Sequence, residues 1–354
     1  MGDCSLFEIK MNFSPKRILI LKIDSIGDYV LFRNFLSDVK KHFSCHITLI
    51  GNELWKDLAL EYDSDNIDSF IWINTSKFSQ SRFYRRLVFV RLNLLKSFDL
   101  LFSSACSRRF YFEDELVKRV AAREKIGVKG DLLNCTENQK AISDKYYTQL
   151  IEVNEIFEFY KNRAFFEAVT GLKLTNTLLS IPVSSQFDNQ KYAVLFIGAA
   201  DEKRRWANDH FVEIARWLLY KYNLNVKICG SKDDVINANK IELELADSKV
   251  QNLVGATSIP ELVQVIAGAK ILISNDTSAV HIAAAVNRSA IAICKGNYYK
   301  RFHPYPIELR RNIVSVFPPD FYMANPFMFD YNKIDINIIS TEIIKNEIDK
   351  LLIN

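Results

Sequence analysis

One segment of the chain combines the residue types that can bind a phosphate group. It covers residues 274–285, with the sequence SNDTSAVHIAAA, and follows an apolar run typical of a β-strand. Thr277 is a favoured helix N-cap, and His281 lies one turn further along the same helix face. A helix N-terminus with free amides, a hydroxyl and an imidazole could bind a phosphate or pyrophosphate. The plainer interpretation is that this junction only caps a helix.

A second junction follows the first apolar run of the chain and reads DSIGD at residues 24–28. Gly27 permits a close turn, and Asp28 opens the next predicted helix. Its carboxylate could act as a general base toward a hydroxyl group within hydrogen-bonding reach. The alternative is that Asp28 only caps its helix. The junction is not a dinucleotide fingerprint, because the G-x-G-x-x-G spacing is absent from the whole chain.

Two further strand-to-helix junctions in the second half carry charged side chains. Gly198 begins a turn of small residues that leads to Lys203 and Arg204. Such cations could neutralise a departing diphosphate where no metal is bound. After another apolar run, Asp233 or Asp234 could accept a hydrogen bond from a ribose hydroxyl. The alternatives are a surface charge cluster for the cations and a helix N-terminus for the aspartates.

The apolar patterns that position these junctions predict regular alternation of strands and helices. We expect strands at residues 17–23, 46–50, 69–73, 98–102, 192–197, 225–229, 250–254, 271–274 and 290–294. We expect helices at residues 29–43, 53–62, 82–96, 209–222, 235–246 and 260–267, after Thr277, and at 338–352, with a mostly helical stretch at 142–169 and a loop at 74–81. Alternation of this kind implies parallel sheets covered by helices on both faces.

A polar segment with one proline, residues 181–190, is the best candidate for a linker between two such sheets. We therefore predict an α/β protein of two Rossmann-like domains that face a cleft, with ligands at the carboxyl ends of the strands. The predicted domains are residues 1–185 and residues 186–335. A C-terminal closing helix, within residues 336–354, is expected to pack back toward the first domain.

Composition and length agree with a two-domain globular protein. The chain has 354 residues, 49% hydrophobic and 25% charged, which is too long for one ordinary core. No apolar run is long enough to span a bilayer, and no secretory signal pattern is present at the N-terminus. The six cysteines are scattered without paired spacing, which argues against a zinc site and fits reduced thiols in a cytoplasmic protein.

Positive charge is concentrated in the first half of the chain. Residues 77–129 contain thirteen Lys and Arg against five Asp and Glu, a local charge of +8. Residues 83–98 interleave such cations with Phe, Tyr, Val and Leu, as a basic amphipathic helix does. This helix could lie on an anionic membrane surface or receive an anionic substrate; the alternative is a solvated helix face. Nucleic acid is not an expected partner, because no binding motif for it accompanies the patch.

The four junctions, taken in order, resemble glycosyltransferase family 9, the heptosyltransferase-like enzymes. The S-x-G-D turn of that family matches SIGD at residues 25–28, and its G-A turn and K-x-W-P motif are similar to GA at 198–199 and RRWA at 204–207. Its N-L-x-G-x-T-S segment matches residues 252–258. Its N-D-[TS]-G-x-x-H-x-A-A signature is similar to NDTSAVHIAA at 275–284. The resemblance spans about residues 17–300.

This resemblance implies a GT-B fold and metal-independent, inverting transfer of a sugar, heptose or another hexose-like sugar, from a nucleotide diphosphate donor. The implied acceptor is lipopolysaccharide core or another surface glycan or glycolipid, anionic in character. It implies no cofactor and no metal, and a cytoplasmic protein in peripheral contact with the inner membrane. A second hypothesis is a non-catalytic GT-B-like module that binds a nucleotide or glycan, and a nicotinamide oxidoreductase is a distant third.

The resemblance also assigns roles. Asp28 would deprotonate the acceptor hydroxyl, while Thr277, Ser278 and His281 would hold the donor diphosphate with support from Asp276. The expected donor-binding residues are Gly198, Lys203, Arg204, Asp233, Asp276, Thr277, Ser278 and His281. The expected acceptor-side residues are Gly27, Arg85 and Arg86.

Three residues depart from the family pattern at the donor site. Arg204 stands where the family has lysine, so the charge is kept but a planar guanidinium replaces a point charge, unless Lys203 takes that role. Ser278 replaces a glycine and adds a hydroxyl where the phosphate approaches the backbone. Ala207 replaces a proline. These departures leave open which nucleotide-sugar the site takes.

Overall fold

The computed structural model describes residues 13–183, 191–323 and 330–353. It divides into two compact units, Met1–Thr177 and Leu178–Asn354. This division precedes the predicted boundary after residue 185, because the chain there already packs on the second unit: the Ile181 amide donates to the Ala285 carbonyl at 3.0 Å. Residues 184–190 of the predicted linker lie outside the described residues.

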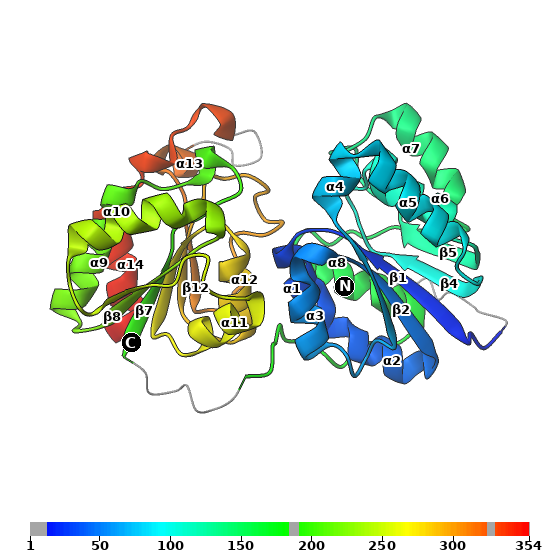
Figure 1. Ribbon diagram of the computed structural model, residues 1–354, viewed down its shortest axis with the longest axis horizontal. Coiled ribbons are helices and arrows are strands. Elements are labelled where there is room, and N and C mark those ends of the chain that lie inside the picture. The colour runs from blue at the N-terminus through cyan, green and yellow to red at the C-terminus, as the bar shows by residue number, and fades with distance from the viewer. Residues whose placement is uncertain (1–12, 184–190, 324–329, 354) are drawn as a thin grey trace. The chain divides into compact units, whose positions relative to one another are not determined.

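The first unit is built on a six-stranded parallel sheet with the order β3-β2-β1-β4-β5-β6 (Figure 1). Its strands are β1 (Arg17–Lys22), β2 (His46–Asn52), β3 (Ser69–Ile73), β4 (Phe98–Ser103), β5 (Ala122–Val128) and β6 (Gln149–Ile151). In β1, every residue after the first is buried, as expected of a parallel strand covered on both faces. The chain order reverses between β1 and β4, so the carboxyl ends of these two strands form the switch point where ligands bind in such sheets.

Helices cover both faces of the first sheet. They are α1 (Ile26–Phe32), α2 (Leu36–Phe43), α3 (Lys56–Tyr62), α4 (Thr75–Gln80), α5 (Arg82–Asn93), α6 (Glu115–Arg119), α7 (Glu137–Ser143) and α8 (Glu158–Thr170). Helices α4, α5 and α6 pack on one face, where their apolar side chains share a core with Leu19 and Leu21 of β1. Helix α1 packs with α8, where Phe32 lies against Phe166 with ring centroids 5.5 Å apart.

The second unit repeats this topology with a parallel sheet of order β12-β11-β10-β7-β8-β9. Its strands are β7 (Tyr192–Phe196), β8 (Asn225–Cys229), β9 (Val250–Asn252), β10 (Ile271–Asn275), β11 (Ala290–Ile293) and β12 (Ile313–Val316). Here the order reverses between β7 and β10. The predicted junctions at Gly198 and Asp276 therefore both follow strands at the switch point of the second sheet.

The helices of the second unit are α9 (Asn208–Lys221), α10 (Val235–Leu245), α11 (Ile259–Ala267), α12 (Ser278–Ala285), α13 (Pro319–Met323) and α14 (Thr341–Ile353). The C-terminal helix α14 packs on α9 and contacts β11, and it buries Ile344 and Ile348 in the core of this unit. The second unit therefore includes the helix that the sequence assigned to a separate segment. Its packing toward the first domain stays a prediction.

Some predicted elements were wrong. The predicted loop at 74–81 contains α4, because the Asn74 side chain caps it by accepting from the Lys77 amide at 2.9 Å. The predicted helical stretch at 142–169 contains strand β6, and α8 begins only at Glu158. Strands β5 and β12 were not predicted; β5 begins with Ala122 and three consecutive charged residues, 123–125, which conceal its buried apolar end.

Among the residues described above, none of the helices combines the length and apolar character needed to cross a membrane.

Candidate functional site

The junction between β10 and α12 forms the centre of the candidate site. All five residues of β10 are buried, and the chain leaves its carboxyl end at Asp276. Thr277 is the N-cap of α12, as predicted: its Oγ1 accepts from the Ala279 amide at 3.3 Å and lies 3.1 Å from Ser274 Oγ. Thr277 and Ser278 are half-buried, so their polar groups remain partly accessible at the helix N-terminus.

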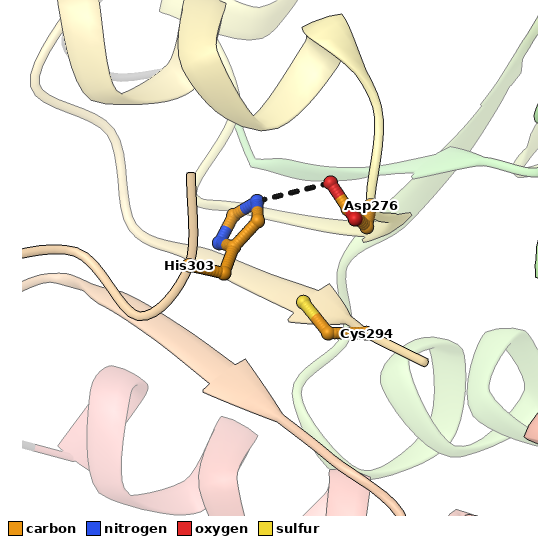
Figure 2. Close-up of side chains that lie close together, drawn as sticks. All are labelled: Asp276, Cys294 and His303. Carbon is orange, nitrogen blue, oxygen red and sulfur yellow. Dashed lines mark ion pairs between the residues drawn. The ribbon is translucent and has the colours of Figure 1, made fainter. Parts of the chain in front are cut away.

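Asp276 holds two basic side chains at this junction. Its Oδ2 lies 2.9 Å from Arg204 Nη2, and its Oδ1 lies 3.2 Å from His303 Nε2, the pair drawn in Figure 2. Arg204 Nη2 also donates to the Asp276 carbonyl oxygen. Burial alone would raise the pKa of the Asp276 carboxyl, but His303 and Arg204 outweigh burial and hold it well below its usual range. Asp276 is therefore ionised and positions both Arg204 and His303.

His281 lies on α12 one turn beyond the cap and is buried. Its Nδ1 is 2.5 Å from the Tyr305 hydroxyl, and its ring stacks on His303 with centroids 5.6 Å apart. Burial, followed by the positive charge of His303, lowers the pKa of His281 to about 3. The imidazole is therefore neutral at physiological pH. When the Tyr305 hydroxyl donates to Nδ1, Nε2 carries the proton and can donate to a phosphate oxygen.

Asn275 joins the two strands of the switch point. Its side-chain amide donates to the carbonyl oxygens of Ile197 at 2.8 Å and Gly198 at 3.2 Å. Its Oδ1 accepts from the Trp206 amide at 3.0 Å. Asn275 thus fixes the turn after β7 and the loop that carries Arg204 against the end of β10. Sequence reasoning placed Asn275 in the family motif but gave it no role.

Gly198 provides space for a buried carboxylate. A Cβ added at Gly198 would lie 2.2 Å from Asp234 Oδ2, so only glycine fits beside that side chain. Asp234 is buried, accepts from the Ser231 amide at 2.8 Å and pairs with Arg205 at 3.3 Å. Asp233 is exposed to solvent beside it. Asp234 therefore has a local structural role, as the alternative interpretation of this junction expected, while Asp233 remains accessible.

The two candidate phosphate-binding cations differ in their surroundings. Lys203 is exposed in a short 3-10 turn, Glu202–Arg204. Arg204 is half-buried and engaged by Asp276. The structure thus brings Arg204 into the junction and leaves Lys203 at its edge.

Three residues of the junction could offer ligand atoms to a metal ion. The side-chain donor atoms of Asp276, Cys294 and His303 all lie within 4.8 Å of one another (Figure 2). However, Arg204 already pairs with the same carboxylate, and burial together with the Asp276 charge raises the pKa of the Cys294 thiol well above its usual range. A cysteine must be a thiolate to bind a metal ion. The donor set therefore fits a hydrogen-bonded network better than a metal site.

The first unit carries the other predicted junction, after β1. Ser25, not Asp28, is the N-cap of α1, and Asp28 lies in the first turn with its Oδ2 3.0 Å from Ser25 Oγ. Asp28 is half-buried and Gly27 is buried. Next to them, the buried Lys22 ammonium pairs with Asp24 at 2.8 Å. Asp28 is thus not the N-cap residue itself, but its carboxylate accepts from the N-cap hydroxyl, and its role as a base stays a prediction.

A second charged pair reaches the same junction from the segment that follows β4. Arg109 is paired with the buried Glu113, with Nε 2.9 Å from Oε1. Its pKa is raised because pairing with Glu113, with smaller contributions from Asp24 and Asp28, outweighs burial. Arg109 therefore interacts electrostatically with Asp28 across the switch point of the first sheet, a relation that sequence reasoning missed.

The acceptor-side arginines lie on α5. The Arg85 guanidinium donates to the carbonyl oxygens of Phe78 at 3.1 Å and Ser79 at 3.0 Å, at the end of α4. Arg85 therefore joins two helices, whereas Arg86 is exposed. Neither residue is brought to the Asp28 junction by a described contact, and their acceptor-side role stays a prediction.

His303 and Tyr305 were also missed. Both lie in the loop between β11 and β12, within the sequence YYKRFHPY at residues 298–305. The many aromatic and basic side chains of this loop were the signal that could have indicated a functional site. The loop contains no strand–cap–helix pattern of the kind used to find the other junctions.

Two Rossmann-like sheets, each with polar junctions at its switch point, are the architecture of GT-B glycosyltransferases. The sequence model of glycosyltransferase family 9 (heptosyltransferase) matches residues 116–318, more than half of the chain, and the chain belongs to this family.

The matched relatives agree with this assignment. Lipooligosaccharide heptosyltransferase 2 of Haemophilus ducreyi is 36% identical over 88 residues, 24% of this chain and 25% of that protein. The chain therefore matches about a quarter of the length of these curated relatives.

Two solved structures share the fold of the whole chain. The glycosyl transferase family 9 protein from Veillonella parvula has a TM-score of 0.70 at 16% identity, with 98% of each chain covered. E. coli heptosyltransferase WaaC with ADP-2-deoxy-2-fluoro heptose has a TM-score of 0.71 at 18% identity, with 94% of this chain and 99% of that chain covered. The two-unit arrangement of sheets predicted from the sequence is thus a GT-B fold.

Proposed function

We propose that this protein is an inverting, metal-independent, heptosyltransferase-like enzyme. It moves heptose or another hexose-like sugar from a nucleotide diphosphate to lipopolysaccharide core or another surface glycan. The observation that carries this proposal is the Asp276 carboxylate, which holds Arg204 and His303 beside the N-terminus of α12. Cationic groups beside free helix amides make a site for a diphosphate.

The donor half of the mechanism rests on the β10–α12 junction. Thr277, Ser278 and the first amides of α12 contact the diphosphate oxygens, and neutral His281 donates from Nε2. As the bond between the sugar C1 and the diphosphate oxygen breaks, negative charge grows on the leaving group. Arg204 stabilises that charge without a metal ion, and the exposed Lys203 assists from the edge of the junction. Asp233 accepts from the ribose.

The acceptor half rests on Asp28. Its carboxylate takes the proton of the acceptor hydroxyl as that oxygen attacks C1 from the side opposite the diphosphate. One displacement forms the new glycosidic bond, breaks the old one and inverts the configuration at C1. Arg109, whose charge interacts with that of Asp28, is a further candidate residue for this half of the mechanism.

The acceptor is anionic, and the protein acts in the cytoplasm at the inner membrane face. The charge of +8 over residues 77–129 supports this assignment, because it is complementary to a phosphorylated glycolipid and to anionic lipids. A lipid-linked acceptor is presented at that surface. Gly27 in the first turn of α1, and Arg85 and Arg86 on α5, are the acceptor-side candidates.

The proposal is tested by ligand binding and by product analysis. Thermal unfolding is measured with ADP, GDP, UDP and CMP donors, because a ligand that binds only the folded state raises the melting temperature. A shift confined to ADP compounds, with inverted configuration in the NMR spectrum of the transfer product, is the expected result. Binding without transfer or donor hydrolysis across the panel would instead identify a non-catalytic nucleotide-binding module. A product with retained configuration would contradict the mechanism.

A further inference from the structure

Helix α5 has an unusual outward face. Its inward face is ordinary: Val88 and Leu92 are buried and pack with Phe78 of α4 and with Leu116 of α6. Figure 1 shows α4 and α6 beside α5. A surface helix packed in this way normally places polar side chains on the opposite side.

Apolar side chains occupy that opposite side instead. The exposed fractions are 72% for Phe83, 50% for Leu87, 50% for Val90 and 79% for Leu94, the C-cap residue. Their spacing of four, three and four residues places them in one stripe about 60° wide at 3.6 residues per turn. The stripe lies on the side of the helix away from Val88 and Leu92. Single exposed apolar side chains are common, but four in one row mark an interaction surface.

Positive charge borders this stripe on both sides. Arg86 lies on one side and Arg91 on the other, with Arg82 at the start of the helix, and all three are exposed. No acidic residue occurs between positions 82 and 96, where Lys96 follows. Within the part of the chain that the structure describes, these three arginines take part in no ion pair, unlike Arg109 and Arg119 in the same unit. The guanidinium groups are therefore available to an anionic partner.

We propose that α5 docks the first unit onto an anionic phospholipid bilayer. The Phe83–Leu87–Val90–Leu94 stripe enters the boundary between headgroups and acyl chains, and the flanking arginines pair with lipid phosphates. Charge complementarity selects this occupant, because a stripe bordered only by cations fits a surface that is apolar inside and anionic at its rim. The inference deepens the proposed function and rests on it, since a lipid-linked acceptor requires the enzyme at a bilayer surface.

The test is vesicle flotation of the full chain with phosphatidylcholine vesicles, with and without phosphatidylglycerol. Wild-type protein is expected to float only with the anionic vesicles. Phe83→Gln/Leu87→Gln/Leu94→Gln, which removes three apolar side chains but keeps good helix formers, is expected to lose at least about tenfold in vesicle affinity. Arg82→Gln/Arg91→Gln is expected to lose roughly thirtyfold.

A matched control is available on α10, where Ile236 and Leu243 are also exposed, at 71% and 81%. Acidic residues Glu242 and Glu244 accompany them, so Ile236→Ser/Leu243→Ser is expected to float like wild type. Unchanged melting temperatures in all variants exclude unfolding as the cause, since the substituted side chains are exposed.

Three results would overturn the inference. A lipid-docking role is contradicted if phosphatidylglycerol does not change the flotation of the wild-type protein. It is also contradicted if the α5 substitutions leave vesicle binding unchanged. Self-association or capture of a protein through α5 without vesicle binding contradicts it as well. The triple apolar variant is also assayed for transfer to a soluble acceptor, where we expect wild-type rates. If the triple variant no longer floats but still transfers sugar to the soluble acceptor, both proposals are supported. If the wild-type protein floats but neither it nor the variant transfers sugar, only the proposed function is overturned.

Discussion

The Asp276 carboxylate lies 3.2 Å from the Nε2 atom of His303, a residue that the sequence did not single out. His303 is buried, and its other ring nitrogen lies 2.9 Å from the Ser315 hydroxyl of β12. Asp276 therefore connects the end of β10 to the loop between β11 and β12. Because its second oxygen binds Arg204, one carboxylate organises both basic groups of the candidate donor site.

Asp276→Asn is expected to weaken that site without removing the fold. The amide keeps the shape of the side chain but leaves Arg204 and His303 without their negative partner. We expect the free energy of unfolding to fall by about 2 kcal/mol, because the residue is buried and one partner, Arg204, is partly exposed. Affinity for the nucleoside diphosphate should fall about tenfold or more, since Arg204 is no longer held in place.

Urea unfolding and titration calorimetry measure these two effects. Asp233→Asn is the matched control for stability, since Asp233 is exposed beside the buried Asp234. Its stability should stay within about 0.5 kcal/mol of wild type. An Asp276→Asn protein with unchanged nucleotide affinity would remove the carboxylate from the donor site.

The buried neutral state of His281 predicts a pH dependence of stability. Its pKa falls from 6.5 to about 3 in the folded protein, because burial and the charge of His303 disfavour the imidazolium. Unfolding therefore takes up a proton at this group between those two values. The stabilising contribution is complete above pH 6.5 and is lost as the pH falls toward 3, at about 1.4 kcal/mol per pH unit.

The measurement is urea unfolding at several pH values, compared between wild type and His281→Gln. Above pH 6.5 the difference between them should be constant, and it should shrink as the pH falls toward 4. Comparison of the two proteins cancels the other titrating groups, including Glu113, whose pKa burial raises. The Asp276 carboxyl changes the pH dependence of stability only at pH values below its usual pKa, and these lie below the pH range of this measurement. A difference that is independent of pH would mean that His281 is not held neutral.

Asp28→Asn should separate binding from catalysis. The amide cannot accept the hydroxyl proton, so we expect the turnover rate to fall by a factor of about 10² or more. Nucleotide affinity should be unchanged, because the donor residues lie in the second unit. Asp57→Asn is the matched control, since Asp57 also lies in the first turn of its helix, α3. Retained turnover in Asp28→Asn would remove this carboxylate from the mechanism.

Much of the fold could be predicted because its central strands are apolar and buried. β1, with Ile18 to Leu21 buried, and β10 gave a clear pattern, and the Thr277 cap follows from residue type alone. Two edge strands, β3 and β9, were predicted, whereas the other two, β6 and β12, were not. β6 has only three residues with Gln149 exposed, so little of its length carries an apolar signal.

The candidate site was predictable only where it follows a strand. Asp276 and Arg204 occupy such junctions, whereas His303 and Tyr305 reach the site from a loop by tertiary packing. Their partners, Asp276 and His281, are 27 and 24 residues away along the chain. Local propensity contains no information about contacts at that separation. The contacts of Arg85 with the end of α4 could not be predicted for a similar reason, because they depend on how two helices pack.

Removal of metal ions should leave transfer unchanged. Asp276, Cys294 and His303 are close enough to hold an ion, but the Cys294 thiol has a raised pKa and Asp276 is paired with Arg204. A metal would have to displace a proton from the thiol and compete with a guanidinium for the carboxylate. We therefore expect full transfer activity after dialysis against a chelator and in the Cys294→Ser variant, which keeps a hydroxyl in place of the thiol. The metal content of the purified protein is measured by elemental analysis, and the transfer rate is measured before and after chelation. A rate that falls on chelation and returns with added zinc or iron, but not in Cys294→Ser, would show that the cluster binds a functional metal.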